Sequence, residues 1–278
     1  MTNSSNNKIR LIAVDLDGTL FNSDHRVSET TQTVLQQTLA SGMQVILATG
    51  RNRTFVNDLL HQLDLDIPYI CSGGAMLISG RDGEVLYSKI LQLNGQLPAV
   101  ISWAESHQTC LLTEYADGRM RWYSTTEFLD KLTPGIRAEF PIQDYSQNPL
   151  IDFAVPAVKI CFLQMGESVA SAAELERVFP DFQFVYSGYN CQDLTALGVD
   201  KGNALAFYAE QHGYSQDEIA AIGDQTNDIS MLRYAGLSFA MGGAPEEVKL
   251  AAQFIAPSND DDGAAWVMQN IHSFSENH

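Results

Sequence analysis

The chain has 278 residues, of which 45% are hydrophobic and 18% charged, with 20 Gly and 9 Pro, and this composition excludes collagen, a coiled coil and a wholly disordered chain. The formal net charge of -18 has the wrong sign for a surface that binds nucleic acid or anionic lipid, so we expect neither as a partner. We find no apolar run long enough to span a membrane and no signal peptide, which predicts a soluble, cytoplasmic protein.

The first part of the chain alternates between short apolar runs and amphipathic stretches. Ile9–Val14 is apolar without polar alternation, as expected for a parallel strand buried on both faces. Ser28 can N-cap a helix whose apolar residues recur at helical spacing until Gly42, and a second strand follows at 45–48. A further helix after Arg51 and a strand at Tyr69–Cys71 complete a βαβαβ pattern.

The middle of the chain, residues 87–188, has a different pattern. Asp117-Gly118 is a hairpin signal between two strand-like runs, Leu111–Tyr115 and Met120–Tyr123. We therefore expect an inserted α+β domain, which would cover the cleft of the surrounding domain as a lid.

The α/β alternation returns near the C-terminus. The predicted elements are a helix at Lys201–His212, a strand at Ile219–Ile222, a helix at Asp228–Tyr234, a strand at Leu237–Ala240 and a helix at Pro245–Ala252. Right-handed crossovers would bring both ends of the chain into one parallel sheet, with a cleft outside the carboxyl ends of its strands. We expect a Rossmann-like α/β core formed by residues 1–86 and 189–278.

The four cysteines are far apart in the sequence and form no Cys-x-x-Cys pair. They are Cys71, Cys110, Cys161 and Cys191. This spacing supports neither a disulfide framework nor a zinc site. We expect all four to be reduced and mostly buried.

An acidic motif directly follows the first predicted strand. In Asp15-Leu16-Asp17-Gly18-Thr19, residues two apart project to the same side of an extended segment, so Asp15 and Asp17 can address one reacting group. Two carboxylates at a strand end suit either a magnesium site or a nucleophile with a general acid/base. The alternative is an Asx turn with no catalytic role.

A second acidic cluster follows the strand at Ile219–Ile222. It contains Asp224, Asn227 and Asp228, whereas a purely capping role would use one acidic residue. This cluster is therefore a second set of candidate site residues, at the same edge of the sheet as Asp15 and Asp17.

Two further clusters carry positive charge. Thr49, Gly50 and Arg51 offer a hydroxyl, a backbone N–H and a guanidinium, which together could hold a phosphate. Lys201 begins a helix, where its charge opposes the helix dipole unless an anion lies nearby. A solvated surface lysine is the alternative.

The four clusters, in this order, resemble the haloacid dehalogenase (HAD) superfamily of phosphohydrolases, and closely its Cof-type branch with an inserted α/β cap (subclass IIB). The resemblance covers nearly the whole chain and includes Asp228–Leu232, Ala240–Gly242 and Asp262-Gly263, while the cap matches only in size and place. It implies an HAD-like core, phosphoryl transfer to a carboxylate and Mg²⁺ as the cofactor.

Carried over residue by residue, the resemblance makes Asp15 the nucleophile and Asp17 the general acid/base. Mg²⁺ would take a carboxylate oxygen of Asp15, the backbone carbonyl of Asp17 and the carboxylate of Asp224, with Asp228 close behind. Arg51 would contact the substrate or the cap. The residues that would hold the transferring phosphoryl group are Leu16, Thr49, Gly50, Lys201 and Asn227.

Two segments depart from the family pattern. Gly73-Gly74-Ala75 stands where the family commonly has Asn-Gly-Ala, and Gly243 stands where it commonly has Asn. Both changes remove an asparagine side chain near the cleft, so substrate contacts or loop ordering there can differ from the family.

We therefore predict a magnesium-dependent phosphatase that hydrolyses small phosphorylated metabolites, such as sugar phosphates or phosphorylated cofactors, through an aspartyl-phosphate. A phosphotransferase or mutase is the related alternative. A phospho-acceptor domain or a metabolite-binding regulator without turnover is the alternative from another class. Asp17 argues against these last two, because neither needs a general acid/base. Nothing in the sequence indicates whether the chain is a monomer or an oligomer.

Overall fold

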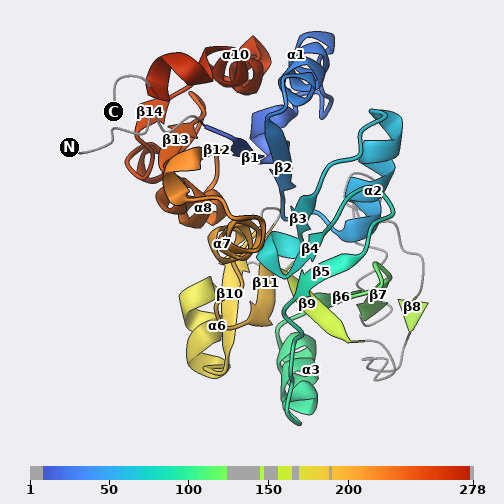
Figure 1. Cartoon of the computed structure of the whole chain (residues 1–278). Helices are drawn as coiled ribbons and strands as arrows, with labels where there is room; N and C mark the ends of the chain where they lie inside the picture. Colours follow the sequence, from blue (N-terminus) through green and yellow to red (C-terminus); the bar gives the residue numbers. More distant parts are fainter. Residues whose placement is uncertain (1–8, 124–144, 147–155, 165–168, 188–189, 276–278) are drawn as a thin grey trace, which may run out of the picture. The chain divides into compact units, whose positions relative to one another are not determined.

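The computed structural model describes residues 9–123, 145–146, 156–164, 169–187 and 190–275, which divide into two compact units (Figure 1). Unit 1 consists of the described residues within Met1–Arg51, Phe55–Tyr87 and Asp200–His278. Unit 2 consists of Asn52–Thr54 and the described residues within Ser88–Val199. An α/β domain is thus interrupted by a second unit.

Unit 1 is built on an eight-stranded sheet with the order β14-β13-β12-β1-β2-β3-β4-β5. These strands are β1 (Leu11–Val14), β2 (Gln44–Ala48), β3 (Tyr69–Cys71), β4 (Met76–Ile78), β5 (Val85–Ser88), β12 (Ile219–Gly223), β13 (Leu237–Ala240) and β14 (Phe254–Ile255). Strand β1 pairs in parallel with β12 on one side and β2 on the other, and β4 is antiparallel to β3. All residues of β1 and β12 are buried, as expected for central strands covered on both faces.

Helices cover both faces of this sheet. They are α1 (Glu29–Ala40), α2 (Arg53–Gln62, whose first two residues belong to unit 2), α7 (Lys201–His212), α8 (Ile229–Tyr234), α9 (Glu246–Lys249) and α10 (Gly263–Ser275). Leu11, Ile46 and Ile70 of the sheet share an apolar core with Leu205 of α7 and Leu232 of α8. Helices α1 and α10 lie on the opposite side of the sheet (Figure 1).

Local signals fix where the helices of unit 1 begin. Ser28 caps α1 by accepting the backbone N–H of Thr31 at 3.0 Å, as predicted. Asp200 caps α7 in the same way through the backbone N–H of Asn203 at 2.7 Å. This cap places Lys201 in the first turn of α7.

Unit 2 is built on a six-stranded sheet with the order β10-β11-β9-β6-β7-β8. Its strands are β6 (Thr109–Tyr115), β7 (Met120–Tyr123), β8 (Tyr145–Ser146), β9 (Ala157–Gln164), β10 (Phe182–Tyr186) and β11 (Cys191–Ala196). All pairs with a recorded register are antiparallel except β7 with β8. Helices α3 (Leu97–Ser106) and α6 (Ala172–Val178) contribute Val100 and Leu175 to an apolar core around Phe162 of β9.

The expectation of four reduced cysteines is wrong for one pair, because Cys161 and Cys191 form a disulfide. Cys161 lies on β9 and Cys191 on the neighbouring strand β11, with their Cα atoms 6.1 Å apart. Their separation of 30 residues in the sequence gives no sign of this pairing, which arises from the order of strands in the sheet. Cys71 and Cys110 are buried and form no disulfide, as predicted.

The observed elements follow the predicted alternation, with one difference at a domain boundary. The strands at Tyr69–Cys71 and Leu237–Ala240 and the helix at Lys201–His212 have the predicted bounds. The expected return to the core at residue 189 is too early, because β11 pairs with β10 and β9 and so belongs to unit 2. Across the described residues, the helices are too short or too polar to cross a membrane.

Candidate active site

Lys201 holds the carboxylate of Asp15 at the carboxyl end of β1. Asp15 directly follows this buried strand and is only 4% exposed. The Lys201 Nζ lies 2.6 Å from Asp15 Oδ1 and 2.5 Å from Asp228 Oδ1. A lysine in the first turn opposes the helix dipole, and these two carboxylates supply the anions that compensate. Lys201 is therefore a buried partner of the acidic clusters rather than a solvated surface residue.

Asp228 organises the loop that follows β12. Its Oδ2 accepts the backbone N–H groups of Asp224 and Gln225, each at 2.9 Å, while its Oδ1 accepts from Lys201. An added Cβ at Gly223 would lie 2.6 Å from the Asp228 side chain, so only glycine allows this close packing. Because its Oδ2 accepts two backbone N–H groups and its Oδ1 accepts from Lys201, Asp228 positions this loop and the ammonium together.

Asp224 contacts the motif that follows β1. Its Oδ1 accepts a hydrogen bond from Thr19 Oγ1 at 3.0 Å, and its Oδ2 accepts one from Gln225 Nε2 at 3.1 Å. Gly18 has a φ of +79°, and an added Cβ there would lie 2.4 Å from Asp224 Oδ2. Both the backbone conformation and the approach of Asp224 therefore require glycine at position 18.

The pKa values of this cluster reflect its burial and its excess of carboxylates. Burial raises the pKa of Asp15 well above its usual value, and the charge of Asp228 adds to this effect while Lys201 opposes it. Burial and the charge of Asp228 also raise the pKa of Asp224 to about 6. Burial would lower the pKa of Lys201, but the charges of Asp15 and Asp228 outweigh it and raise that pKa. The positive charge of Lys201 thus partly offsets three carboxylates, of which it contacts two.

This cluster has the composition of a site for a hard divalent cation. Oxygen atoms of Asp15, Asp224 and Asp228 lie within 4.8 Å of one another. Carboxylates are the ligands that Mg²⁺ and Ca²⁺ prefer. A bound cation would favour the charged forms of Asp15 and Asp224, the two groups whose pKa values are raised.

Asp17 and Arg51 form a bidentate ion pair. Arg51 Nε and Nη2 donate to the two carboxylate oxygens of Asp17 at 3.0 and 2.7 Å. The guanidinium carbon of Arg51 lies 4.7 Å from the centre of the Phe55 ring, which supports the flat group from one side. Arg51, which we expect at the phosphate or the cap, binds Asp17 in this structure, because its planar fork matches a carboxylate. A contact of Arg51 with the substrate or the cap stays a prediction.

The other predicted phosphate-binding residues lie in loops that follow the strands of the same sheet. The Thr49 hydroxyl accepts the backbone N–H of Arg51 at 3.1 Å. An added Cβ at Gly50 would lie 3.9 Å from Asn227 Nδ2, so the loops after β2 and β12 approach each other. Asn227 Oδ1 is buried without a hydrogen-bond partner among the described residues. Leu16 has a fully buried side chain, so a ligand could contact it only through its backbone.

The two glycines that replace family asparagines leave open space. An added Cβ at Gly73 or Gly243 would meet no atom within 4 Å, so a side chain at either position would begin in open space. Gly74 is different, because a Cβ there would lie 2.2 Å from the backbone oxygen of Asp200. Glycine at position 74 is thus needed for the loop after β3 to reach the start of α7.

Three neighbours of the acidic residues were not singled out as site residues in the sequence. Gly223 makes room for Asp228, and Thr19 and Gln225 bind Asp224. Thr19 belongs to the Asp-x-Asp-Gly-Thr motif, so its position could have been inferred from the sequence. Gln225 and Gly223 acquire their roles only from the shape of the loop after β12.

Comparison with known proteins gives one consistent result. The sequence matches the family model of the haloacid dehalogenase-like hydrolases over residues 12–268. It is 28% identical to the phosphatase YwpJ of Bacillus subtilis (strain 168), an alignment that covers 95% of this chain and 100% of YwpJ. It is 29% identical to the pyridoxal phosphate phosphatase YbhA of Escherichia coli (strain K12), covering 92% of this chain and 96% of YbhA.

A similar fold is present among solved structures. A haloacid dehalogenase-like hydrolase from Bacteroides thetaiotaomicron superimposes with a TM-score of 0.77 at 27% identity, covering 95% of this chain and 100% of that one. The similarity therefore extends over both units and their order in the sequence.

The contact between Gly18 and Asp224 can be tested with a matched pair of variants. Gly18 and Gly42 both have a positive φ, but only at Gly18 does an added Cβ meet another residue. We expect Gly42→Ala to lower the free energy of unfolding by about 1–2 kcal/mol, the cost of alanine in the left-handed region. Gly18→Ala should cost clearly more in urea denaturation, because Asp224 must also move. Equal losses would show that the Asp224 contact has no energetic weight.

Proposed function

The chain belongs to the haloacid dehalogenase-like hydrolases and is an enzyme of the phosphatase type, and we propose that it hydrolyses small phosphorylated metabolites with Mg²⁺ through a phosphoaspartyl intermediate on Asp15. The observation that carries this proposal is the buried carboxylate of Asp15 beside Lys201, Asp224 and Asp228 at the carboxyl ends of β1 and β12. The nucleophile Asp15, the ammonium of Lys201 and the carboxylate oxygens that could bind a metal ion are thus close to one another.

The substrate class is supported by relatives and by charge. YbhA is named as a phosphatase of pyridoxal phosphate, which is a phosphorylated cofactor. The net charge of -18 disfavours polyanions such as nucleic acids as substrates. A small phosphate monoester is the class that remains, and we propose that unit 2 selects among such esters.

In the first step, Asp15 attacks phosphorus and the alkoxide leaves. Lys201 contacts the attacking carboxylate directly and so keeps it oriented and ionised. The residues that would hold the metal are Asp15, the backbone carbonyl of Asp17, and Asp224, with Asp228 keeping their loop in place. Bound there, Mg²⁺ supplies positive charge that offsets the charge of the phosphoryl oxygens. Thr49, Gly50, Asn227 and the Leu16 backbone would surround those oxygens.

Asp17 has opposite tasks in the two steps. It gives a proton to the leaving alkoxide, and afterwards its carboxylate takes a proton from the water that hydrolyses the phosphoaspartate. The Arg51 fork donates to both oxygens of Asp17 and so orients its carboxylate form. Arg51 must release one of these oxygens before Asp17 can carry the proton that it gives to the alkoxide. Arg51 acts through Asp17 and is therefore a positioning residue.

Phosphotransfer to a second metabolite would use the same first step. An acceptor metabolite would need a binding site of its own, whereas water needs none. Hydrolysis is therefore the function that we propose, and product analysis with a phosphorylated metabolite distinguishes the two outcomes.

We expect Mg²⁺ to raise the melting temperature at a pH of about 7.5 but hardly at about 5. In the metal-free protein the pKa of Asp224 is raised from 3.8 to about 6, so its contribution to stability is present below pH 3.8 and is lost as the pH rises through about 6. Mg²⁺ needs the carboxylate, so protons compete with it below that pH. Thermal denaturation with and without Mg²⁺ measures the effect, and Asp224→Asn should lose it. A rise that is equal at both pH values would contradict the metal site.

The two tasks of Asp17 can be separated by the choice of leaving group. An aryl phosphate with an acidic phenol needs little protonation, so Asp17→Asn should still phosphorylate Asp15 and then stall. We expect a burst of phenol close to the enzyme concentration and one added phosphoryl group by intact mass, with almost no burst from a sugar phosphate. Asp15→Asn is the control and should show no burst. Near-normal turnover of the sugar phosphate by Asp17→Asn would remove Asp17 from the mechanism.

The role of Arg51 can be distinguished from substrate binding by the pattern of kinetic losses. In single-turnover measurements, Arg51→Ala should lower the rate of phosphoenzyme formation from a sugar phosphate by roughly 10²-fold and from an aryl phosphate much less, because only the sugar ester depends on proton donation by Asp17 in this step. Hydrolysis of the phosphoenzyme, which uses Asp17 as a base, is common to both esters. Arg51→Lys should restore little, since an ammonium cannot bind both oxygens at once. An increase in KM alone, similar for both esters, would instead assign Arg51 to the substrate.

A further inference from the structure

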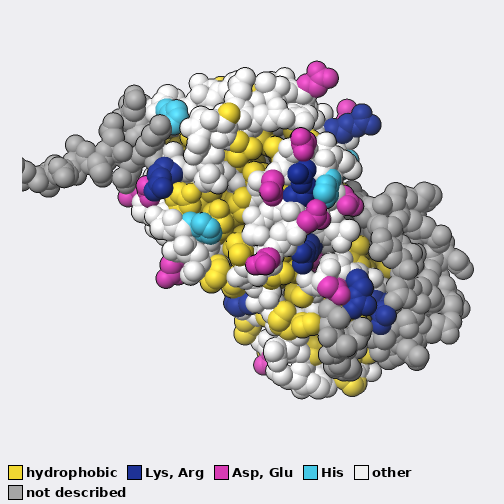
Figure 2. Space-filling model, turned by 45° about the vertical axis from the view of Figure 1, so that its right-hand side comes forward, with side chains coloured by type: hydrophobic (Ala, Val, Ile, Leu, Met, Phe, Trp, Pro, Cys, Tyr) yellow, Lys and Arg dark blue, Asp and Glu magenta, His cyan; other side chains and the backbone are white. Residues whose placement is uncertain are grey.

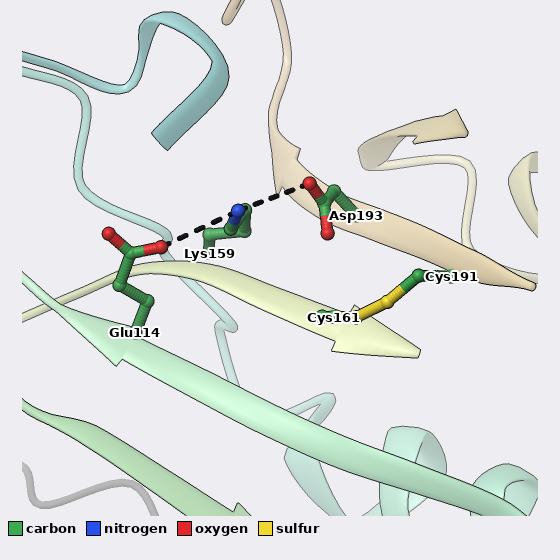
Figure 3. The surroundings of a disulfide bond; sticks show 5 residues. All are labelled: Glu114, Lys159, Cys161, Cys191 and Asp193. Carbon is green, nitrogen blue, oxygen red and sulfur yellow. Dashed lines mark hydrogen bonds and ion pairs between the residues drawn. A yellow bond between two sulfur atoms is a disulfide. The ribbon is translucent and has the colours of Figure 1, made fainter. Parts of the chain in front are cut away.

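A second buried charged cluster lies in unit 2, on the sheet face opposite α3 and α6. Lys159 Nζ is 3.1 Å from Asp193 Oδ2 and 3.5 Å from Glu114 Oε2, and Figure 3 shows the lysine between the two carboxylates. All three side chains are buried. Burial would lower the pKa of Lys159, but the charges of Asp193 and Glu114 outweigh it and raise that pKa, so the lysine stays charged.

The disulfide belongs to the same face of the sheet. Asp193 lies opposite Cys161 in the ladder between β11 and β9, and Cys191 lies opposite Leu163. Because side chains alternate along a strand, Lys159 and Cys161 share a face with Cys191 and Asp193. Figure 3 shows the bridge beside the ion pair.

Two neighbouring links therefore join β9 to β11. The bridge connects Cys161 to Cys191, and the ion pair connects Lys159 to Asp193, two positions along each strand. Each link joins a residue of β9 to the residue of β11 that lies two positions before the one opposite it in the ladder. Both links therefore stabilise the same alignment of β9 with β11.

We propose that Cys161 and Cys191 form a reversible redox modification site, which a small peroxide or a small disulfide oxidises, and that the Lys159–Asp193 ion pair supports formation of the bridge. The ladder hydrogen bonds and the ion pair hold the two strands in register without the bridge. The thiols of the reduced protein therefore remain neighbours, at a Cα separation of 6.1 Å that lies within the range of disulfides. Closing and opening the bridge requires no change in strand pairing.

The oxidation balances with hydrogen peroxide as the oxidant. One thiolate attacks peroxide to give a sulfenic acid and hydroxide, and the second thiol displaces water from that sulfenic acid to form the S–S bond. In total, two thiols lose two electrons and two protons, and peroxide becomes two water molecules. Glutathione reverses the reaction when two molecules of the thiol are oxidised to glutathione disulfide.

The first experiment identifies the modified residues in the full chain. The reduced protein is treated with hydrogen peroxide, the remaining thiols are alkylated after denaturation, and peptides are analysed by mass spectrometry. We expect one bridge between Cys161 and Cys191, a melting temperature several degrees higher, and full reversal by a thiol reductant. Cys161→Ala should lose this response, whereas Cys110→Ala, on the same face, should keep it. Oxidation that begins at Cys71 or Cys110, or a bridge that resists reduction in the folded protein, would overturn the proposal.

A second experiment tests the support from the ion pair. In a glutathione redox buffer, Asp193→Asn should lower the equilibrium constant for bridge formation several-fold, because the ion pair between β9 and β11 is lost. Glu114→Gln also removes one carboxylate from Lys159, but Glu114 lies on β6, so the constant should change little. Equal effects of the two variants would show that the ion pair does not support the bridge.

Discussion

The contact of the Lys201 ammonium with Asp15 and Asp228 is the interaction on which the rest of unit 1 depends. It joins the loop after β1 to the loop after β12 through the first turn of α7, over a sequence separation of 186 residues from Asp15 to Lys201. A buried ammonium without partners would be very costly, and so would buried carboxylates without a cation. Each charged group is therefore tolerated in the core only because the others are present.

The loops around this contact are shaped by close packing rather than by flexibility. Glycine at positions 18, 74 and 223 lets the backbone or a carboxylate approach where a Cβ would collide. The result is a closely packed frame around Asp15. Close packing suits an attack that must occur in line with a leaving group, because it holds the reacting carboxylate in one position.

Much of the site could be predicted from the sequence, because its residues follow strands. The pattern of apolar runs located β1, β2 and β12, and parallel strands bring their carboxyl ends to one edge, so the acidic clusters had to meet there. The pairing of Arg51 with Asp17 could not be predicted, because a guanidinium can bind a carboxylate or a phosphate and the spacing of residues in the sequence does not distinguish the two. The Cys161–Cys191 bridge and the late boundary at Val199 share another cause: both depend on β11 joining the sheet of unit 2, and strand order is not encoded in local periodicity.

The strand order has a consequence for synthesis on the ribosome. Chains emerge from their N-terminus, and domains fold as their segments become available. The strands of unit 2 lie between residues 109 and 196, so its sheet can form while the chain after residue 196 is still unmade. Strand β1, by contrast, is made first but lies between β2 and β12, and β12 begins only at residue 219. Until then the growing chain presents an apolar strand with one unpaired edge, which is the part of this protein that most needs protection from neighbouring nascent chains.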